Sequence, residues 1–300
     1  MAGRAYIGIS GWTYRPWRGV FYPPGLRQRD ELAYAAGRFT SVEVNGTFYG
    51  LQRPTSFAAW AAGTPPGFVF AVKGSRFITH AKKLLEVEGP LANFMASGPL
   101  RLGEKLGPFL WQLPERLPFD RDRLARFLDL LPHDTEEAAA LARRHDHRLE
   151  GRAWTEADGL RPVRHALEVR HRSFTDPALV DLLRERNVAL VTADTPDWPR
   201  TLDLTADFAY VRLHGTPVLY WSGYEDDALD LWAARVGAWL AGRDPPDPER
   251  IVAQTLPTLP RGRDVYVYFD NDAQVRAPFD ALGLMERLDR RGQRRAAIPG

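Results

Sequence analysis

The 300-residue sequence contains no cysteine and only three methionines. Without cysteine the chain forms no disulfide, has no thiolate nucleophile and offers no thiolate ligand to a metal. No apolar stretch approaches the roughly 18 residues of a membrane span, so we expect no transmembrane helix. The N-terminal Met1–Arg4 runs directly into a predicted strand, so we also expect no signal peptide. These features predict a cytoplasmic protein.

Charge of one sign is also scarce, because 40 basic and 38 acidic residues leave a formal net charge of +2. Such a small excess does not by itself indicate a nucleic-acid-binding protein. The apolar fraction of 44% and the charged fraction of 26% are typical of globular proteins. Nine tryptophans and ten tyrosines are a rich supply of polar aromatic side chains. Several of them follow predicted strands, where their rings are placed to stack on a ligand.

Short apolar runs recur along the chain, and most of them become polar on one face near their end. The runs are Tyr6–Ser10, Val42–Asn45, Phe68–Lys73, Pro108–Leu113, Ala166–Arg170, Val188–Asp194, Phe208–His214 and Val265–Asp270. Helical stretches lie between them, and this alternation predicts parallel strands with helices outside. We therefore expect a TIM-like (β/α)8 barrel of eight parallel strands, with its site at the C-terminal mouth.

The predicted helices and insertions follow from capping signals and from uneven spacing. Asp176–Arg186 has an Asp at its N-cap and a Pro in its first turn, which favours a helix start. The sequence also predicts one long helix over Pro90–Leu106. We interpret 1–300 as a single barrel domain, with insertions near 132–165 and 241–263. Neither insertion carries an apolar core of its own.

The alternation of side chains along each strand predicts which residues point into the barrel. The outward face meets the helices and is apolar, so the polar face is expected inside. The polar set on this face is Glu43, Asn45, Lys73, Glu168, Arg170, Asp194, Arg212, His214 and Asp270. These charges also suit a structural network, but such a network is a poor route to stability because each buried ion must be desolvated. We therefore interpret them as a site.

The residue types in this set suggest roles. Guanidinium and ammonium groups at Arg170, Arg212 and Lys73 indicate an anionic ligand. His214 is a candidate acid or base near neutral pH, and a buried neutral imidazole explains it equally well. Glu168 and Asp270 complete the candidate catalytic residues. Further candidate ligand-binding residues flank the strand ends, and they are Trp12, Tyr14, His171, Asn271 and Asp272.

Metal chemistry is only weakly indicated. The sequence has seven histidines and no HExxH pattern. His145-Asp146-His147 lies in a charge-rich stretch of the kind that is usually solvated. One divalent metal held by carboxylates fits the sequence, whereas a multi-zinc centre does not, and no cofactor is identified.

The order of motifs resembles the YecE-like family of uncharacterised proteins (domain of unknown function 72). The matching segments are Gly8–Tyr14, Phe21–Pro23, Val42–Tyr49, Phe70–Lys73, Ile78–His80, Glu168–His171, Val211–Gly215 and Tyr268–Asp272. The resemblance implies a TIM-like barrel related in shape to apurinic endonucleases and sugar isomerases, and it implies no established activity. The chain has Asp270 where many relatives have Asn, and Phe174 where many have Trp.

Three functions stay open at this point. The first is a hydrolase acting on a phosphate-bearing or nucleic-acid-like substrate, and the second is a sugar-type isomerase or lyase with one divalent metal. The third is a non-catalytic barrel that binds its ligand to regulate a partner. The expected partner is an anionic small molecule or a nucleic acid, and no membrane is expected. The sequence does not indicate an oligomeric state.

Overall fold

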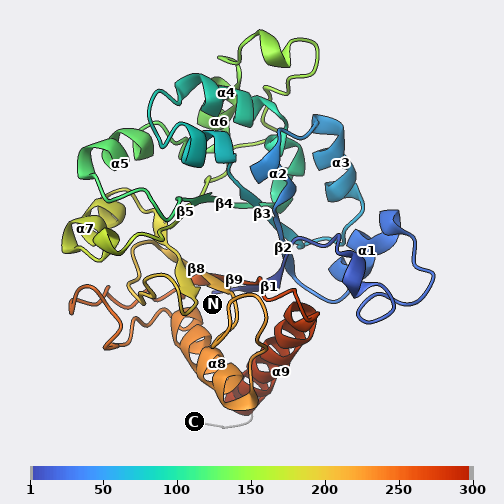
Figure 1. Ribbon diagram of the computed structural model, residues 1–300, viewed down its shortest axis with the longest axis vertical. Coiled ribbons are helices and arrows are strands. Elements are labelled where there is room, and N and C mark those ends of the chain that lie inside the picture. The colour runs from blue at the N-terminus through green and yellow to red at the C-terminus, as the bar shows by residue number, and fades with distance from the viewer. Residues whose placement is uncertain (1–2, 297–300) are drawn as a thin grey trace.

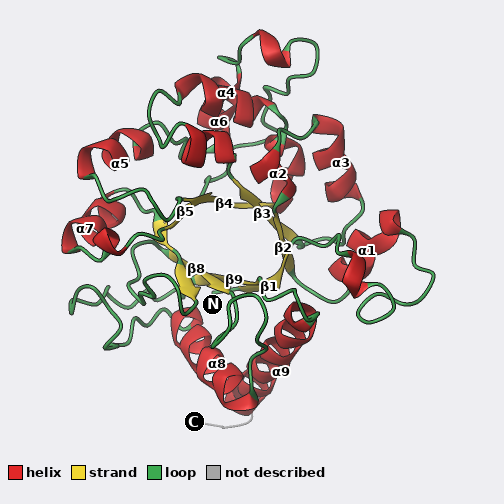
Figure 2. Ribbon diagram, in the orientation of Figure 1, coloured by secondary structure: helices red, strands yellow, loops and turns green. Residues whose placement is uncertain are grey.

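The strands form a nearly closed parallel barrel, seen almost along its axis in Figure 2. This computed structural model describes residues 3–296. Neighbouring strands follow the order β6-β5-β4-β3-β2-β1-β9-β8-β7, and every recorded pairing between them is parallel. The strands are β1 (Ala5–Ser10), β2 (Ser41–Val44), β3 (Val69–Lys73), β4 (Leu106–Gln112), β5 (His165–Glu168), β6 (Ala189–Leu190), β7 (Thr192–Asp194), β8 (Phe208–Leu213) and β9 (Asp264–Phe269). The predicted TIM-like architecture is confirmed.

The sixth predicted strand is divided into β6 and β7, with only Val191 between them. β6 pairs with β5, and β7 pairs with β8, so the two short pieces together bridge the ring. The division has a hydrogen-bonding cause. Leu190 N–H donates to the Thr205 hydroxyl at 2.7 Å, and Thr205 comes from the segment that precedes β8. The Leu190 N–H is therefore bonded to a side chain and not to the backbone of a neighbouring strand.

Helices surround the barrel, and α8 and α9 lie together beside β8, β9 and β1 (Figure 1). The α-helices are α1 (Glu31–Ala36), α2 (Gly46–Tyr49), α3 (Pro54–Ala62), α4 (Glu88–Ala96), α5 (Arg121–Leu128), α6 (Thr135–Ala142), α7 (Pro177–Glu185), α8 (Asp226–Leu240) and α9 (Arg276–Ala296). A π-helix, η3 (Phe77–Ala81), follows β3. The short 3-10 helices are η1 (Arg15–Trp17), η2 (Gln28–Asp30), η4 (Pro99–Lys105), η5 (His147–Leu149) and η6 (Arg172–Phe174). The predicted start of α7 is confirmed, because Asp176 accepts a hydrogen bond from Ala178 N–H at 2.8 Å.

The prediction of a single helix over Pro90–Leu106 is wrong. The chain forms α4 and then η4, with Gly98 between them in the left-handed region at φ 115°. A side chain at Gly98 would place its Cβ 2.5 Å from Pro54 Cα at the start of α3. Glycine therefore permits both the turn and the close approach of α3.

Two apolar layers fill the fold. One lies between the strands and the helices and includes Val42, Val211 and Val267. The other fills the interior of the barrel toward the N-terminal ends of the strands and includes Phe208, Tyr210, Tyr266 and Tyr268. Tyr6 stacks on Tyr266, with 4.7 Å between the ring centroids. The inward and outward faces predicted for β8 and β9 are thus those observed. Aromatic rings thus occupy the N-terminal part of the barrel interior, and the charged residues lie nearer the C-terminal ends of the strands.

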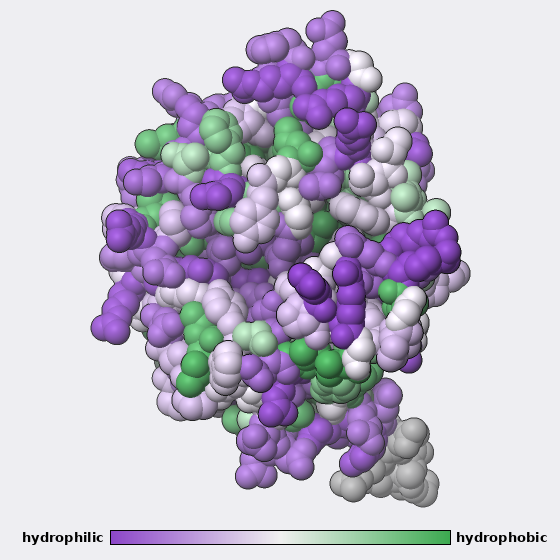
Figure 3. All heavy atoms as spheres, turned by 45° about the vertical axis from the view of Figure 1, so that its right-hand side comes forward, coloured by the Kyte–Doolittle hydropathy of each residue, from purple (hydrophilic) through white to green (hydrophobic). Residues whose placement is uncertain are grey.

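The predicted insertions contain little regular structure. The segment 132–165 carries α6 and η5, and the segment 241–263 contains no helix or strand. Asp203 holds the second segment by accepting hydrogen bonds from Ile251 N–H and Val252 N–H. Within the described residues, no helix is both long and apolar enough to cross a membrane. The face shown in Figure 3 is mostly hydrophilic, and its hydrophobic residues form separate small groups.

Candidate functional site at the C-terminal mouth

Arg212 on β8 is the centre of a buried charge cluster at the C-terminal ends of the strands. Its guanidinium is 2.9 Å from Glu43, 2.7 Å from Glu168 and 2.8 Å from Asp270. These carboxylates come from β2, β5 and the end of β9, so strands from opposite sides of the barrel meet here. Arg212 has no exposed surface. Its guanidinium is therefore engaged by carboxylates of the protein, and a role of Arg212 in ligand binding stays a prediction.

Two of the carboxylates, Glu168 and Asp270, are held ionised by this arrangement. Burial alone raises the pKa of Glu168, but Arg212 and Arg170 outweigh that effect and hold the pKa well below its usual range. The same competition between burial and Arg212 lowers the pKa of Asp270. Hydrogen bonds complete the cluster, because Gln112 donates to Glu168 at 2.9 Å and Tyr210 donates to Glu43 at 2.6 Å.

Ser10 joins β1 to the same cluster. Its hydroxyl donates to Glu43 and accepts from Arg212 at 3.0 Å and from Asn45 at 2.9 Å. The sequence prediction did not include Ser10 in the inward set. Its position at the polar end of the first apolar run was the available signal.

A cavity of about 570 Å³ opens above the charge cluster. This mouth cavity is lined by Tyr14, Asn45, Phe48, Tyr49, Lys73, Arg76, His80, Gln112, Arg170, Tyr220, Asp270 and Asp272. Its size falls within the range usual for small-molecule sites. Six of the predicted site residues are in this lining, and they are Tyr14, Asn45, Lys73, Arg170, Asp270 and Asp272. The predicted site did not include Phe48, His80, Gln112, Tyr49, Arg76 and Tyr220. The last three lie in loops or short helices, where strand alternation gives no signal.

Lys73 at the end of β3 is the principal cation on the cavity wall. It is only 8% exposed, yet its ammonium has no hydrogen-bond or ion-pair partner among the described residues. The nearest recorded contact is the face of Phe48, with Nζ 4.5 Å from the ring centroid. Burial, reinforced by Arg212, lowers the pKa of Lys73 to about 8. The group is thus mostly protonated at neutral pH.

Arg170 supplies a second cation to the wall. It donates to Glu168 at 2.8 Å and lies over Trp198, with Cζ 3.6 Å from the ring centroid. These two contacts fix the guanidinium against the cavity. Burial together with Arg170 and Lys73 lowers the pKa of His80 to about 4, so His80 is neutral at pH 7.

His214 and Asp270 lie side by side but differ in access to the cavity. His214 Nδ1 is 3.1 Å from Asp270 Oδ2, and the imidazole is fully buried beneath Trp198 and Tyr220. Asp270 lines the cavity, whereas His214 does not. Burial and the charge of Asp270 raise the pKa of the neighbouring Asp272 to about 6.

The structure separates four predicted residues from the charge cluster. Asp194 points away from the barrel interior, because it accepts from Arg200 at 2.5 Å and from Trp232 on α8 at 3.3 Å. The interior positions of its strand are occupied by Ala189 and Val191 instead. The assignment of Asp194 to the inward face was therefore wrong.

Asn271, His171 and Trp12 also lie outside the charge cluster. Asn271 is buried and donates to Asp280 on α9 at 2.7 Å. His171 caps η6 by accepting from Ser173 N–H at 3.2 Å. Trp12 lines a smaller cavity beside the mouth cavity. The first two thus have local structural contacts that account for them.

No group of three or more His, Cys, Asp or Glu residues suited to a metal ion occurs among the residues that the structure describes. The carboxylates at the mouth instead surround Arg212, which occupies the place that a cation would take.

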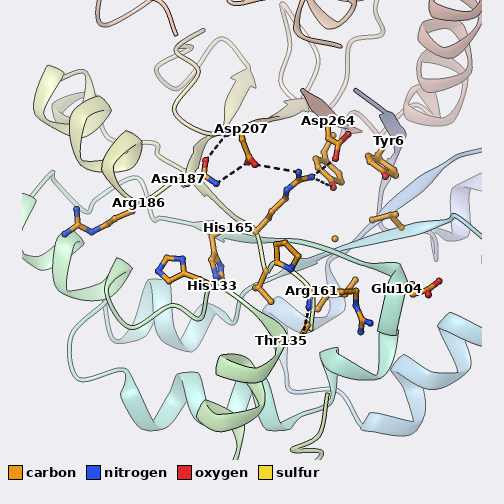
Figure 4. A pocket seen from close by; sticks show the side chains of 17 residues that line it. Tyr6, Glu104, His133, Thr135, Arg161, His165, Arg186, Asn187, Asp207 and Asp264 are labelled. Carbon is orange, nitrogen blue, oxygen red and sulfur yellow. Dashed lines mark hydrogen bonds and ion pairs between the residues drawn. The ribbon is translucent and has the colours of Figure 1, made fainter. Parts of the chain in front are cut away.

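A second cavity of about 410 Å³ lies at the opposite, N-terminal mouth (Figure 4). Arg164 in this lining is paired with side chains of the same cavity. Arg164 donates to Asp264 at 2.7 Å and to Tyr266 at 3.1 Å, and Asn187 donates to Asp207 at 3.2 Å. Charged residues at this end of a TIM barrel usually serve stability. The C-terminal mouth is therefore the candidate site.

The fold and the position of the site define an α/β-barrel protein of the TIM type. Residues 6–300 match the family described as "Protein of unknown function DUF72", and the chain belongs to this family. The resemblance inferred from the motifs is confirmed.

Curated relatives match over a shorter stretch. The UPF0759 protein YecE of Escherichia coli K12 is 30% identical over 129 residues, covering 42% of this chain and 44% of the relative. The UPF0759 protein YunF of Bacillus subtilis strain 168 is 26% identical over 125 residues, covering 40% and 43%. The matched stretch thus spans less than half the length of these relatives.

Solved structures of the family match over nearly the whole chain. A DUF72 family protein of Thermotoga maritima has a TM-score of 0.68 and 23% identity, covering 95% of this chain and 99% of that one. A DUF72 family protein of Enterococcus faecalis has a TM-score of 0.65 and 16% identity, covering 96% and 98%. At these identities the likeness shows the fold.

Proposed function

We propose that the protein binds a small anionic molecule, carrying a phosphate or a similar oxyanion, in the mouth cavity. The observation that carries the proposal is Lys73, whose largely buried side chain ends in an ammonium that is open to this cavity and has no hydrogen-bond or ion-pair partner among the described residues. A ligand anion in the cavity would give this ammonium a charge-assisted hydrogen bond that no described residue supplies. Arg170 provides a guanidinium fork on the same wall, which matches oxyanion geometry.

The pairing of the charges supports an anion rather than a cation, because the carboxylates of the cluster are ion-paired and the ammonium of Lys73 is not. Glu43, Glu168 and Asp270 face the two guanidiniums of Arg212 and Arg170. The ammonium of Lys73 adds a third positive charge to these three negative ones. The cluster is therefore neutral before a ligand binds, and on the cavity wall the exposed Arg76 is offset by Asp272, which is mostly ionised at pH 7.

For a reaction, we propose hydrolysis of a phosphate ester. Asp272 is the wall residue suited to accept a proton from an attacking water, because its pKa of about 6 is close to neutral pH. The water oxygen would bond to phosphorus as the ester P–O bond breaks, and the proton taken up by Asp272 would return to the leaving alcohol oxygen. Lys73 would stabilise negative charge on the phosphoryl oxygens. No observation favours the metal-dependent isomerase or lyase, since the described residues hold no group of metal ligands.

The proposal is tested by calorimetric titration of inorganic phosphate into the wild-type protein, Lys73→Met and Lys83→Met. Lys83 is an exposed lysine that does not line the cavity, so it is the matched control. We expect Lys73→Met to weaken binding by roughly tenfold or more, the usual scale for losing a charged hydrogen bond, and Lys83→Met to bind normally. Absence of binding to the wild type, or equal binding to all three proteins, would refute the proposal.

The same proteins test the reaction with p-nitrophenyl phosphate. We expect turnover that is lost in Asp272→Asn while phosphate binding persists. Phosphate binding without turnover in the wild type would instead support the non-catalytic ligand-binding barrel.

A further inference from the structure

Beside the mouth cavity lies a smaller cavity of about 280 Å³, which we call the tryptophan pocket. It is lined by Gly11, Trp12, Thr13, Tyr14, Val44, Asn45, Gly46, Gln52 and Trp60. Tyr14 and Asn45 line both cavities, so the two adjoin along a shared wall. The tryptophan pocket is smaller than sites that hold a whole drug-sized ligand, and it therefore suits one part of a larger ligand.

The aromatic walls of the tryptophan pocket are held in place by their own contacts. Trp12 and Trp60 meet edge to face, with ring centroids 5.4 Å apart and an interplanar angle of 82°. Trp60 packs edge to face on the buried Phe57 of the same helix, α3. The Trp12 carbonyl accepts a hydrogen bond from the Tyr22 hydroxyl at 2.6 Å. A preorganised indole pair of this kind binds flat rings without first having to order itself.

Gln52 gives the tryptophan pocket a polar group. Its Nε2 donates to the carbonyls of Gly46 at 3.3 Å and Gly50 at 3.2 Å, which fixes the amide. Its Oε1 has no hydrogen-bond partner among the described residues and is not buried from solvent. Gln52 thus presents a fixed acceptor, which calls for an N–H or O–H donor on the ligand.

We infer that the ligand has two parts: an anionic group in the mouth cavity, and a flat-faced ring with hydrogen-bond donors in the tryptophan pocket. This inference rests on the proposed function and names the ligand class for that site. A nucleobase and a sugar ring both carry a flat face and such donors, and both occur joined to phosphate. Tyr14 and Asn45 would lie along the link between the two parts.

The test is calorimetric titration with inorganic phosphate, adenosine 5′-monophosphate and glucose 6-phosphate. In the wild type, at least one of the two ring-bearing ligands should bind roughly tenfold or more tightly than inorganic phosphate, the scale of stacking on an aromatic side chain. The adenosine and glucose arms distinguish a nucleobase from a sugar. This gain should fall to about threefold or less in Trp60→Leu and in Gln52→Met, while affinity for inorganic phosphate is retained. Two variants are used because Trp60 also packs on the core, whereas Gln52 is partly exposed.

The matched control is Trp154→Leu. Trp154 stacks with Arg101, and it lines neither cavity, so the control should keep the full gain. Equal affinity for all three ligands in the wild type would overturn this inference and leave the proposed function standing. So would a gain that persists in both pocket variants. Failure of all three ligands to bind would overturn the inference and the proposed function together.

Discussion

Lys73 and Arg212 are both cations near the C-terminal mouth of the barrel, but their surroundings differ. Arg212 contacts three carboxylates and is buried, so it joins β2, β5, β8 and the end of β9. Removing one partner of such a cluster leaves uncompensated buried charge, which is strongly destabilising. Lys73 contacts no carboxylate and faces a cavity. Residue type alone does not distinguish them, because the difference lies in what surrounds each group.

The pH dependence of anion binding follows from the two shifted groups on the cavity wall. Burial lowers the pKa of Lys73 to about 8, so its charge, and with it the affinity for an anion, is lost as pH rises through 8. Burial and Asp270 raise the pKa of Asp272 to about 6, so its negative charge is lost, and affinity rises, as pH falls through 6. Sulfate is the suitable probe because its own charge is constant over this range.

We therefore expect sulfate affinity to fall in two steps between pH 5 and pH 9, with a loss of roughly tenfold by pH 9 from the lysine step. Calorimetry at each pH measures this profile. Lys73→Arg should remove the upper step and Asp272→Asn the lower one. A flat profile in the wild type would contradict these assignments.

At the scale of elements, strand alternation located the inward residues of β2, β5, β8 and β9 correctly. These strands carry apolar residues on one face and polar residues on the other, as in Tyr210, Arg212 and His214 against Val211 and Leu213. Alternation misled at Asp194, because its strand places small apolar side chains inside the barrel. Asp194 accepts hydrogen bonds from Arg200, which lies in a loop, and from Trp232 on α8. No local sequence pattern predicts these two partners.

Gly98 provides a test of the joint between α4 and η4. Gly98→Ala should destabilise the protein by more than about 1 kcal/mol, because the backbone is left-handed there and the added Cβ would meet Pro54. Gly89→Ala is the matched control, since Gly89 lies in α4 with open space around it. Replacing a helical glycine by alanine there should be neutral or stabilise by up to about 1 kcal/mol.

Urea denaturation of both variants measures the difference. Equal stability of Gly98→Ala and Gly89→Ala would show that the joint does not require glycine.

At the scale of the whole molecule, the two mouths of the barrel differ in how their charges are used. At the N-terminal mouth Arg164 is ion-paired with Asp264, whereas at the C-terminal mouth Lys73 faces the cavity with no ion-pair partner among the described residues. The barrel, and the mouth expected to carry the site, followed from the alternation of strands and helices. The tryptophan pocket did not, because Gln52 and Trp60 lie outside the strands and meet Trp12 only through the tertiary fold. The treatment of 1–300 as one domain stays a prediction.

The central claim is that an oxyanion binds at the C-terminal mouth against Lys73. The most direct test is a crystal structure of the protein soaked with tungstate, an electron-dense tetrahedral oxyanion. We predict tungstate within hydrogen-bonding distance of Lys73 Nζ and on the cavity wall formed by Arg170. Tungstate bound only at other places, such as the N-terminal cavity beside Arg164, or an empty C-terminal mouth, would contradict the account.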